Sequence, residues 1–471
     1  MLMQAMLIVA MFGAEPDPRT IPAGERIAYV NRLADRHKGR DAAKYHQQAA
    51  ERFVPLHQLY WPYVEAGDLT KVELYQHVER NLHALWLAAR WRPDEQRILE
   101  EWVKANSETL QALAQAYRRK RCYQPVDEGT RSFVDIEFFL EGMYYAQLQL
   151  IVAATAALHG EWEAAYTGNL CVHRLATHAY QQPLDVHQLM AMTIERLAQE
   201  QLRWFLRCHP PADWVTLKEQ LASGDDMRCP PELLGVVGRL YLYDTIEAWH
   251  EWATNAAKHP YLSDMADAQY GAASAQVDAG LPPDVSLPKS RYQSVEELRA
   301  ALQQSSVEHD WAVALEAQKI HDRWDALPFH EAWRTRDDMA KEYCEKARSA
   351  PALEALGCST WALTNSRGLA VSTELERTAT FTIIALLQHR QEEGRFPAAL
   401  SDLVPKYLRE VPIDSFSGQP LPYRLTKGDQ DFILYSIGQD QKDDQGVAKD
   451  PMGREGDVVY WPPAEVKVER D

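Results

Sequence analysis

Residues 374–397 read ELERTATFTIIALLQHRQEEGRFP, and this stretch decides the fold of the C-terminal part of the chain. Apolar side chains such as Phe381 and Ile384 recur at the spacing of one helical face, whereas Gly394 and Pro397 are typical of a helix end. The pattern predicts an amphipathic helix that ends near residue 394 and docks its apolar face on another part of the protein.

The residues that follow this helix predict a small α+β unit. Residues 398–408 have the apolar spacing of a second short helix that a proline starts or interrupts, and residues 413–420, IDSFSGQP, are rich in turn formers. Residues 421–425 (LPYRL) and 431–437 (DFILYSI) have strand patterns separated by a Lys-Gly-Asp turn. We therefore expect a β-hairpin, with a third short strand at residues 457–461.

Four motifs in this unit follow a recognisable order. They are GRFP at 394–397, PIDSFSG at 412–418, YSIGQD at 435–440 and DVVYW at 457–461. Their order and spacing resemble those of the globular C-terminal domain of the major pseudopilins of bacterial type II secretion. The resemblance covers residues 374–471 and implies a pseudopilin-like α+β domain there.

The same resemblance implies a calcium site, because the corresponding loop of the pseudopilins binds calcium. The resemblance implies that Asp440 and Asp457 are calcium ligands, with Asp443, Asp444 and Asp450 as further candidates. Backbone carbonyls would complete the coordination shell. Calcium is a hard cation that takes several oxygen ligands, which a glycine-containing acidic loop provides. The loop lacks the EF-hand register, and without the resemblance an acidic loop of this kind is typical of a solvated surface connection.

One large departure separates this chain from the pseudopilins. A pseudopilin begins with a cleavable leader and an apolar helix that stays in the membrane, and its globular domain follows directly. Here residues 1–373 come first, and the helix before residue 394 contains Glu374, Glu376 and Arg377. This helix therefore lacks the ~20 apolar residues that span a bilayer. We expect no filament role, since a shared fold does not transmit its function.

The length and composition of the chain limit its class, its number of domains and its possible partners. The chain has 471 residues, 46% apolar and 25% charged, as is ordinary for a soluble globular protein of roughly two to four domains. Its formal net charge of -18 argues against nucleic acid as a partner, because duplex binding depends on clustered Lys and Arg. The one basic run, residues 118–121, ends a helical pattern, where cations favour the helix dipole.

The sequence of the body of the chain predicts a succession of helices, because Ala, Leu, Glu, Gln and Arg dominate and Pro falls between the periodic stretches. Residues 138–206 predict three long helices, of which the first ends at Gly160 and packs with the second as a TPR-like hairpin. No repeat of about 34 residues follows. The fold class is therefore mainly α, an irregular helical bundle or solenoid followed by the small α+β domain.

The helical body divides at a stretch that is poor in large apolar residues. Residues 20–265 form a helical domain, and residues 266–293, rich in Gly, Pro and Ser, form a loop or linker. Residues 294–373 form a second helical segment, in which Ser294 is the N-cap and Glu297 completes a capping box.

The N-terminus and the cysteines bear on the compartment. Residues 1–19 contain an apolar stretch followed by small residues, which predicts a signal segment and an extracytoplasmic location in the periplasm or cell envelope, although no basic residues precede it.

Cys208 and Cys229 lie beside turn-forming segments and would be able to form a disulfide in an oxidising compartment. Cys171 and Cys344 fit buried free thiols better.

Catalytic patterns are sparse. Glu247 and His250 have the E-x-x-H spacing of di-iron bundles, but a second such motif is missing, so an ordinary histidine is favoured. His309, His321 and His330 are each followed by an acidic residue. The first two do not share one face of a helix, however, and converge only if the helix breaks between them.

Two functions follow from these patterns. The favoured one is a non-catalytic exported scaffold whose pseudopilin-like, calcium-binding C-terminal domain docks on a protein partner or an envelope assembly, with no stable transmembrane anchor beyond the N-terminal segment. The whole arrangement is similar to that of uncharacterised bacterial envelope proteins, and this resemblance implies no reaction. The alternative is an enzyme with a pocket in the helical body that uses the histidines and carboxylates of residues 309–331.

Overall fold

The computed structural model describes residues 17–35, 42–87, 90–123, 137–223, 228–229, 231–270, 291–356, 360–449 and 455–464. Most of the predicted signal segment (1–19) and of the predicted linker (266–293) therefore lies outside the described residues, as does Asp450.

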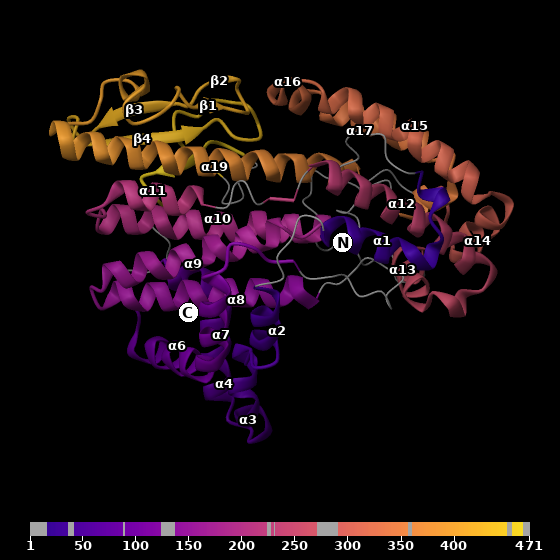
Figure 1. Cartoon of the computed structure of the whole chain (residues 1–471), viewed down its shortest axis with the longest axis horizontal. Coiled ribbons are helices and arrows are strands. Elements are labelled where there is room, and N and C mark those ends of the chain that lie inside the picture. The colour runs from indigo at the N-terminus through magenta and orange to yellow at the C-terminus, as the bar shows by residue number, and fades with distance from the viewer. Residues whose placement is uncertain are drawn as a thin grey trace.

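The described chain folds into nineteen α-helices followed by two small antiparallel sheets (Figure 1). The helices are α1 (Arg26–Asp35), α2 (Ala43–Ala50), α3 (Leu56–Glu65), α4 (Leu69–Arg80), α5 (Leu82–Trp86), α6 (Pro93–Ala105), α7 (Ser107–Tyr117), α8 (Glu137–Leu158), α9 (Trp162–Tyr180), α10 (Asp185–Cys208), α11 (Trp214–Ala222), α12 (Pro231–Thr254), α13 (Pro260–Tyr270), α14 (Val295–Gln304), α15 (Val307–Asp325), α16 (Phe329–Arg334), α17 (Arg336–Ala347), α18 (Pro351–Ala355) and α19 (Thr360–Glu393). The prediction of a mainly helical chain with a small C-terminal sheet is confirmed. None of the described helices combines the length and the hydropathy that crossing a bilayer requires.

The middle of the molecule is a stack of four long helices, α8, α9, α10 and α19, in which each helix packs on the next (Figure 1). The three helices predicted within residues 138–206 are α8, α9 and α10. Helix α8 is followed by Gly160, whose φ of +78° is a conformation that favours glycine. Close packing of α8 on α9 depends on Gly168, because a Cβ atom there would lie 3.0 Å from the Cβ of Ala153.

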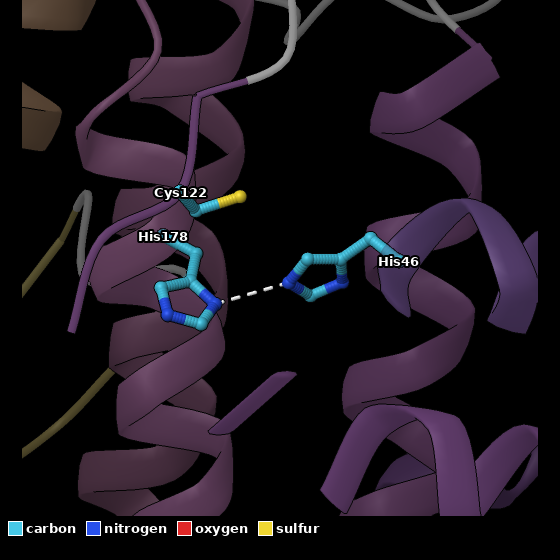
Figure 2. Close-up of side chains that lie close together, drawn as sticks. All are labelled: His46, Cys122 and His178. Atoms are coloured by element: carbon cyan, nitrogen blue, oxygen red, sulfur yellow. Dashed lines mark hydrogen bonds between the residues drawn. The ribbon is translucent and has the colours of Figure 1, made fainter. Parts of the chain in front are cut away.

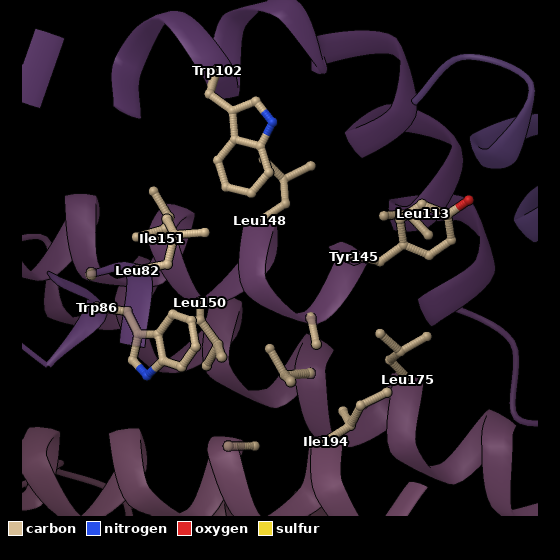
Figure 3. Packing of buried hydrophobic residues seen from close by; sticks show 14 of the residues in the cluster. Leu82, Trp86, Trp102, Leu113, Tyr145, Leu148, Leu150, Ile151, Leu175 and Ile194 are labelled. Carbon is tan, nitrogen blue, oxygen red and sulfur yellow. The ribbon is translucent and has the colours of Figure 1, made fainter. Parts of the chain in front are cut away.

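Two helical cores flank this stack. Helices α2 to α7 pack below α8, and Figure 3 shows their shared core, in which Trp86, Trp102, Tyr145 and Ile151 are almost fully buried. Trp102 keeps its indole N–H satisfied by donating to the carbonyl of Val54 at 2.9 Å.

The second core joins α12, α13 and helices α14 to α18. Its tryptophans are packed rather than exposed, as Trp249, Trp252, Trp311 and Trp324 show. Helices from both predicted helical segments, 20–265 and 294–373, therefore share this core. The first five residues of the predicted linker continue α13 as far as Tyr270. At the start of α14, Ser294 Oγ accepts a hydrogen bond from the Glu297 N–H at 3.2 Å, as predicted for the N-cap.

The C-terminal unit follows α19, which begins at Thr360 and so runs through the predicted boundary between residues 373 and 374. The predicted hairpin is β3 (Tyr423–Thr426) paired with β4 (Asp431–Ser436), and β5 (Val458–Trp461) pairs with β4 on its other edge. A separate two-stranded sheet pairs β1 (Ile413–Asp414) with β2 (Gln419–Pro420).

The prediction of a second helix at residues 398–408 is wrong. The structure has only a 3₁₀ turn, η7 (Leu400–Leu403), followed by turns. Pro405 has no N–H to donate to a helical carbonyl, and the apolar side chains Leu403 and Tyr407 are buried without a continuous helix.

The C-terminal unit shares one continuous core with the helical stack. Apolar residues of β4, β5 and α19 belong to the same buried cluster as residues of α8, α9, α10 and α11. Asp431 adds a polar link, because it pairs with Arg207 of α10 at 2.9 Å and accepts a hydrogen bond from the Trp461 indole at 3.0 Å. On the other side, the Trp333 indole of α16 donates to the carbonyl of Gln439 at 2.7 Å. The sheet is therefore built into the helical body.

Candidate metal centre

Three potential metal ligands meet where α2 faces the C-terminal half of α9. His46 comes from α2, His178 from α9, and Cys122 from the segment that follows α7 (Figure 2). The end of α9 fixes this segment, because the Cys122 N–H donates to Gln181 Oε1 at 2.8 Å and Gln182 Nε2 donates to the Cys122 carbonyl at 3.0 Å. Three stretches that are far apart in sequence thus converge on one point.

The ligand atoms lie close enough for one ion. His46 Nε2 is 3.0 Å from His178 Nδ1, and the two rings are nearly perpendicular, with centroids 5.2 Å apart. Each residue offers one ligand atom, and these atoms lie within 4.8 Å of one another, the Cys122 sulfur included. Among the described residues, no other group of three His, Cys, Asp or Glu side chains meets this condition.

The hydrogen bonds define the tautomers. His178 Nε2 lies 2.8 Å from the carbonyl oxygen of Arg119, which only accepts, so Nε2 carries the proton and Nδ1 has the free lone pair. His46 Nε2 must then donate its proton to His178 Nδ1. A histidine that binds metal through one nitrogen characteristically donates its other N–H to a backbone carbonyl. His178 is held in that state before any ion binds.

Burial keeps the site neutral in the absence of an ion. All three side chains are at most 1% exposed. Burial lowers the pKa of His46 well below its ordinary value and lowers the pKa of His178 to about 4. Burial also raises the pKa of the Cys122 thiol to about 12. Neutral imidazole is the ligand form of histidine, and a cation in the site would release the thiol proton and leave a thiolate.

The ligand set indicates a borderline or soft metal ion. Two imidazoles and one thiolate suit zinc or copper(I), whereas calcium and magnesium require oxygen ligands. With Zn–N bonds of about 2.0–2.1 Å, two nitrogens at a tetrahedral ion lie roughly 3.4 Å apart. The pair in this structure, at 3.0 Å, would separate by a few tenths of an ångström to admit zinc in place of the shared proton. Three protein ligands leave the fourth position for water or another small ligand.

The predicted calcium ligands occupy the loop between β4 and β5, where their carboxylates bond to the loop itself. Asp457, 1% exposed, accepts backbone N–H groups from Asp444 at 3.2 Å and Gly446 at 2.5 Å. Asp440 accepts backbone N–H groups from Lys442 at 3.0 Å and Gly456 at 3.1 Å. These contacts close the loop without an ion.

The other two predicted ligands have separate partners. Asp443 accepts from the Tyr435 hydroxyl at 3.1 Å, and Asp444 Oδ1 pairs with Lys449 at 2.6 Å. The second oxygen of Asp444 is buried and has no hydrogen-bond partner among the described residues. Within the described part of the loop, no three of the predicted carboxylates gather as a metal site requires. The calcium site remains a prediction.

The histidines of residues 309–331 do not converge. His309 lies 3.1 Å from the carbonyl of Ser349, His321 packs against Trp324, and His330 lies against Gly418. Each lies in a different environment, and among the described residues no three His, Cys, Asp or Glu side chains gather there at metal-binding distance.

The two residues of the E-x-x-H motif, Glu247 and His250, also contact different partners. Glu247 pairs with Arg26 of α1 at 2.5 Å, whereas His250 lies 3.2 Å from Asp310. Cys208 and Cys229, which would be able to form a disulfide in an oxidising compartment, are not joined in the structure. Cys208 is exposed, whereas Cys229 is buried and its N–H donates to the Tyr180 carbonyl.

Sequence reasoning missed the metal centre. His46, Cys122 and His178 form no local motif, and histidines in helical patterns are usually structural. No family model, curated protein or solved structure matches the chain. The assignment of the centre therefore depends on its geometry and chemistry.

Proposed function

We propose that the protein binds one zinc ion through His46, His178 and the Cys122 thiolate. One observation carries the proposal: the three ligand atoms lie within 4.8 Å of one another, and the Arg119 carbonyl already fixes the His178 tautomer that a metal needs. The ion would join α2, the segment after α7 and the end of α9. Its role is to fasten the N-terminal helices to the central stack.

The test is to load the purified full chain with Co²⁺, which reports both tetrahedral geometry and thiolate ligation in its absorption spectrum, and then to displace it with Zn²⁺. We expect one ion per chain and a thiolate-to-cobalt band that Cys122→Ser removes. At a zinc concentration 100 times the Kd, binding adds about 2.7 kcal/mol to the free energy of unfolding.

Two matched variants serve as controls. Cys208→Ser makes the same substitution at an exposed thiol, and His187→Gln removes a buried histidine outside the cluster. Both should keep full binding, whereas His46→Gln and His178→Gln should lose it. A parent chain that takes up neither Co²⁺ nor Zn²⁺ contradicts the proposal, and selective uptake of Cu⁺ would replace zinc with copper.

A second function, a non-catalytic exported scaffold that engages a protein partner or an envelope assembly, is favoured by a different observation. The C-terminal unit contains the expected hairpin and third strand, α10 packs on α19, and one core joins this unit to the helical body. A unit fixed in this way would present its loops at a constant position on a rigid body. The calcium titration described in the Discussion tests the resemblance to the pseudopilins at its most specific point.

A further inference from the structure

A cavity of about 220 Å³ lies between α7, α9, α10, α11 and α19, on the far side of Tyr117 from the metal centre. Tyr117 lines the cavity, and its ring also meets His46 edge-on, with the ring centroids 6.5 Å apart. The cavity is large enough for a small ligand with one or two charged groups. Its walls carry more charge than those of the apolar pockets that are common in helical proteins.

Arginines line the walls of the cavity, although the chain as a whole has a net charge of -18. Arg174, Arg228 and Arg377 all line the cavity, and Glu195 is the single acidic residue among the described lining residues. Three arginines and one carboxylate thus share the described walls of a partly enclosed space. Guanidinium groups bind carboxylates and phosphates through paired N–H donors.

The carboxylate is already engaged. Glu195 accepts the Tyr180 hydroxyl at 2.7 Å and lies 3.5 Å from Arg228 Nη2, whose guanidinium also stacks over the Tyr180 ring at 4.2 Å. Glu195 therefore neutralises Arg228 in part, whereas Arg174 hydrogen-bonds elsewhere.

Arg174 has only neutral partners among the described residues. It donates to the Ser223 hydroxyl at 2.9 Å and to the Ser223 carbonyl at 3.4 Å. Burial lowers the pKa of Arg174, as expected for a guanidinium group that has lost water without gaining a carboxylate. Arg174 is half-buried, so its charge has lost part of its hydration, which a bound anion would replace.

His173 adds an unsatisfied polar atom to the same wall. Its side chain is 9% exposed, and Nε2 is buried without a hydrogen-bond partner among the described residues. Burial, reinforced by the charge of Arg377, lowers the pKa of His173 to about 3, so the ring is neutral and available for a hydrogen bond. Cys171 also lines the cavity, but burial raises the pKa of its thiol to about 11, which argues against covalent capture.

We propose that this cavity binds a small oxyanion, either a phosphate monoester or a dicarboxylate, held by Arg174 and Arg228 with His173 as a neutral hydrogen-bond partner. The apolar part of the lining would contact the carbon skeleton of the ligand. This inference does not depend on the metal centre.

The experiment measures binding by calorimetry to the full chain, treated with EDTA, in buffer of low ionic strength. The probes are inorganic phosphate, glycerol 3-phosphate and succinate, which separate phosphate recognition from dicarboxylate recognition. We expect one site per chain for at least one probe, and binding at least tenfold weaker in Arg174→Gln. Arg228→Gln, at a position outside the helices, should weaken binding in the same direction.

Two further variants separate charge from folding. Arg367→Gln removes a half-buried arginine that pairs with Asp325 outside the cavity, and it should leave binding unchanged. Glu195→Gln removes the competing carboxylate and should tighten binding. The proposal is overturned if the parent chain binds none of the three probes, if Arg174→Gln binds as well as the parent, or if Glu195→Gln fails to tighten binding.

Discussion

Several histidines are buried in the interior of this protein. His46, His173, His178 and His187 are each at most 9% exposed, and burial is the main reason that their pKa values fall. Each ring is neutral in the folded chain near pH 7. Two of them face each other in the metal centre and a third lines the cavity, so burial supplies neutral ligands and hydrogen-bond partners where both sites need them.

These lowered pKa values predict a loss of stability in mild acid. The unfolded chain takes up protons near the ordinary histidine pKa of 6.5, whereas burial lowers the folded pKa of His178 and His187 to about 4. The unfolded state therefore binds more protons below pH 6.5. The stability present above that pH is lost as the pH falls toward 4, by about 1.4 kcal/mol per pH unit for each histidine.

Urea unfolding between pH 7 and pH 4 measures this slope. His187→Gln should reduce the slope by the contribution of one histidine, while the same change at the exposed His209 should leave it as in the parent. Equal slopes in parent and His187→Gln would contradict the assignment.

At the scale of elements, the loop between β4 and β5 closes through its own carboxylates. Asp457 and Asp440 accept backbone N–H groups from both arms of the loop, and burial raises the pKa of Asp457. The buried oxygen of Asp444 lacks a hydrogen-bond partner among the described residues, beside an N–H that donates to Asp457. A calcium ion would be the partner that this Asp444 oxygen lacks, and backbone carbonyls would complete the coordination shell of the ion.

We therefore predict that calcium raises the melting temperature of the full chain and that Asp440→Ala combined with Asp457→Ala removes this rise. The readout is the difference between melting curves in calcium and in EDTA, because the substitutions also remove backbone hydrogen bonds. Asp402→Ala, an exposed acidic residue of the same unit, is the control. Identical parent curves in calcium and in EDTA would rule the site out.

At the scale of the whole molecule, α10 joins the helical body to the C-terminal sheet. Asp431 is the polar centre of that joint. It accepts hydrogen bonds from Arg207 of α10, from Lys427, from the Phe432 N–H and from the Trp461 indole. Burial alone would raise the pKa of Asp431, but these donors lower it to about 2.

Asp431→Ala should therefore lower the free energy of unfolding by about 2–3 kcal/mol, the range expected for removing hydrogen bonds to a buried charged group. Urea unfolding checks the magnitude, and hydrogen exchange at the β4 and β5 amides should show that protection falls in the sheet first. Asp402→Ala should cost much less. If the sheet keeps parent-like protection in Asp431→Ala, the joint does not depend on this carboxylate.

The sequence by itself determined the local structure of this protein. Helical periodicity identified α8, α9 and α10, and the turn at Lys427 to Asp429 identified the hairpin, because these signals depend on neighbouring residues. Only the tertiary structure decided which elements share a core and which side chains meet. His46, Cys122 and His178 come from stretches far apart in the chain, as do Arg174, Arg228 and Arg377. Their convergence results from packing between helices, and no pattern along one segment records it.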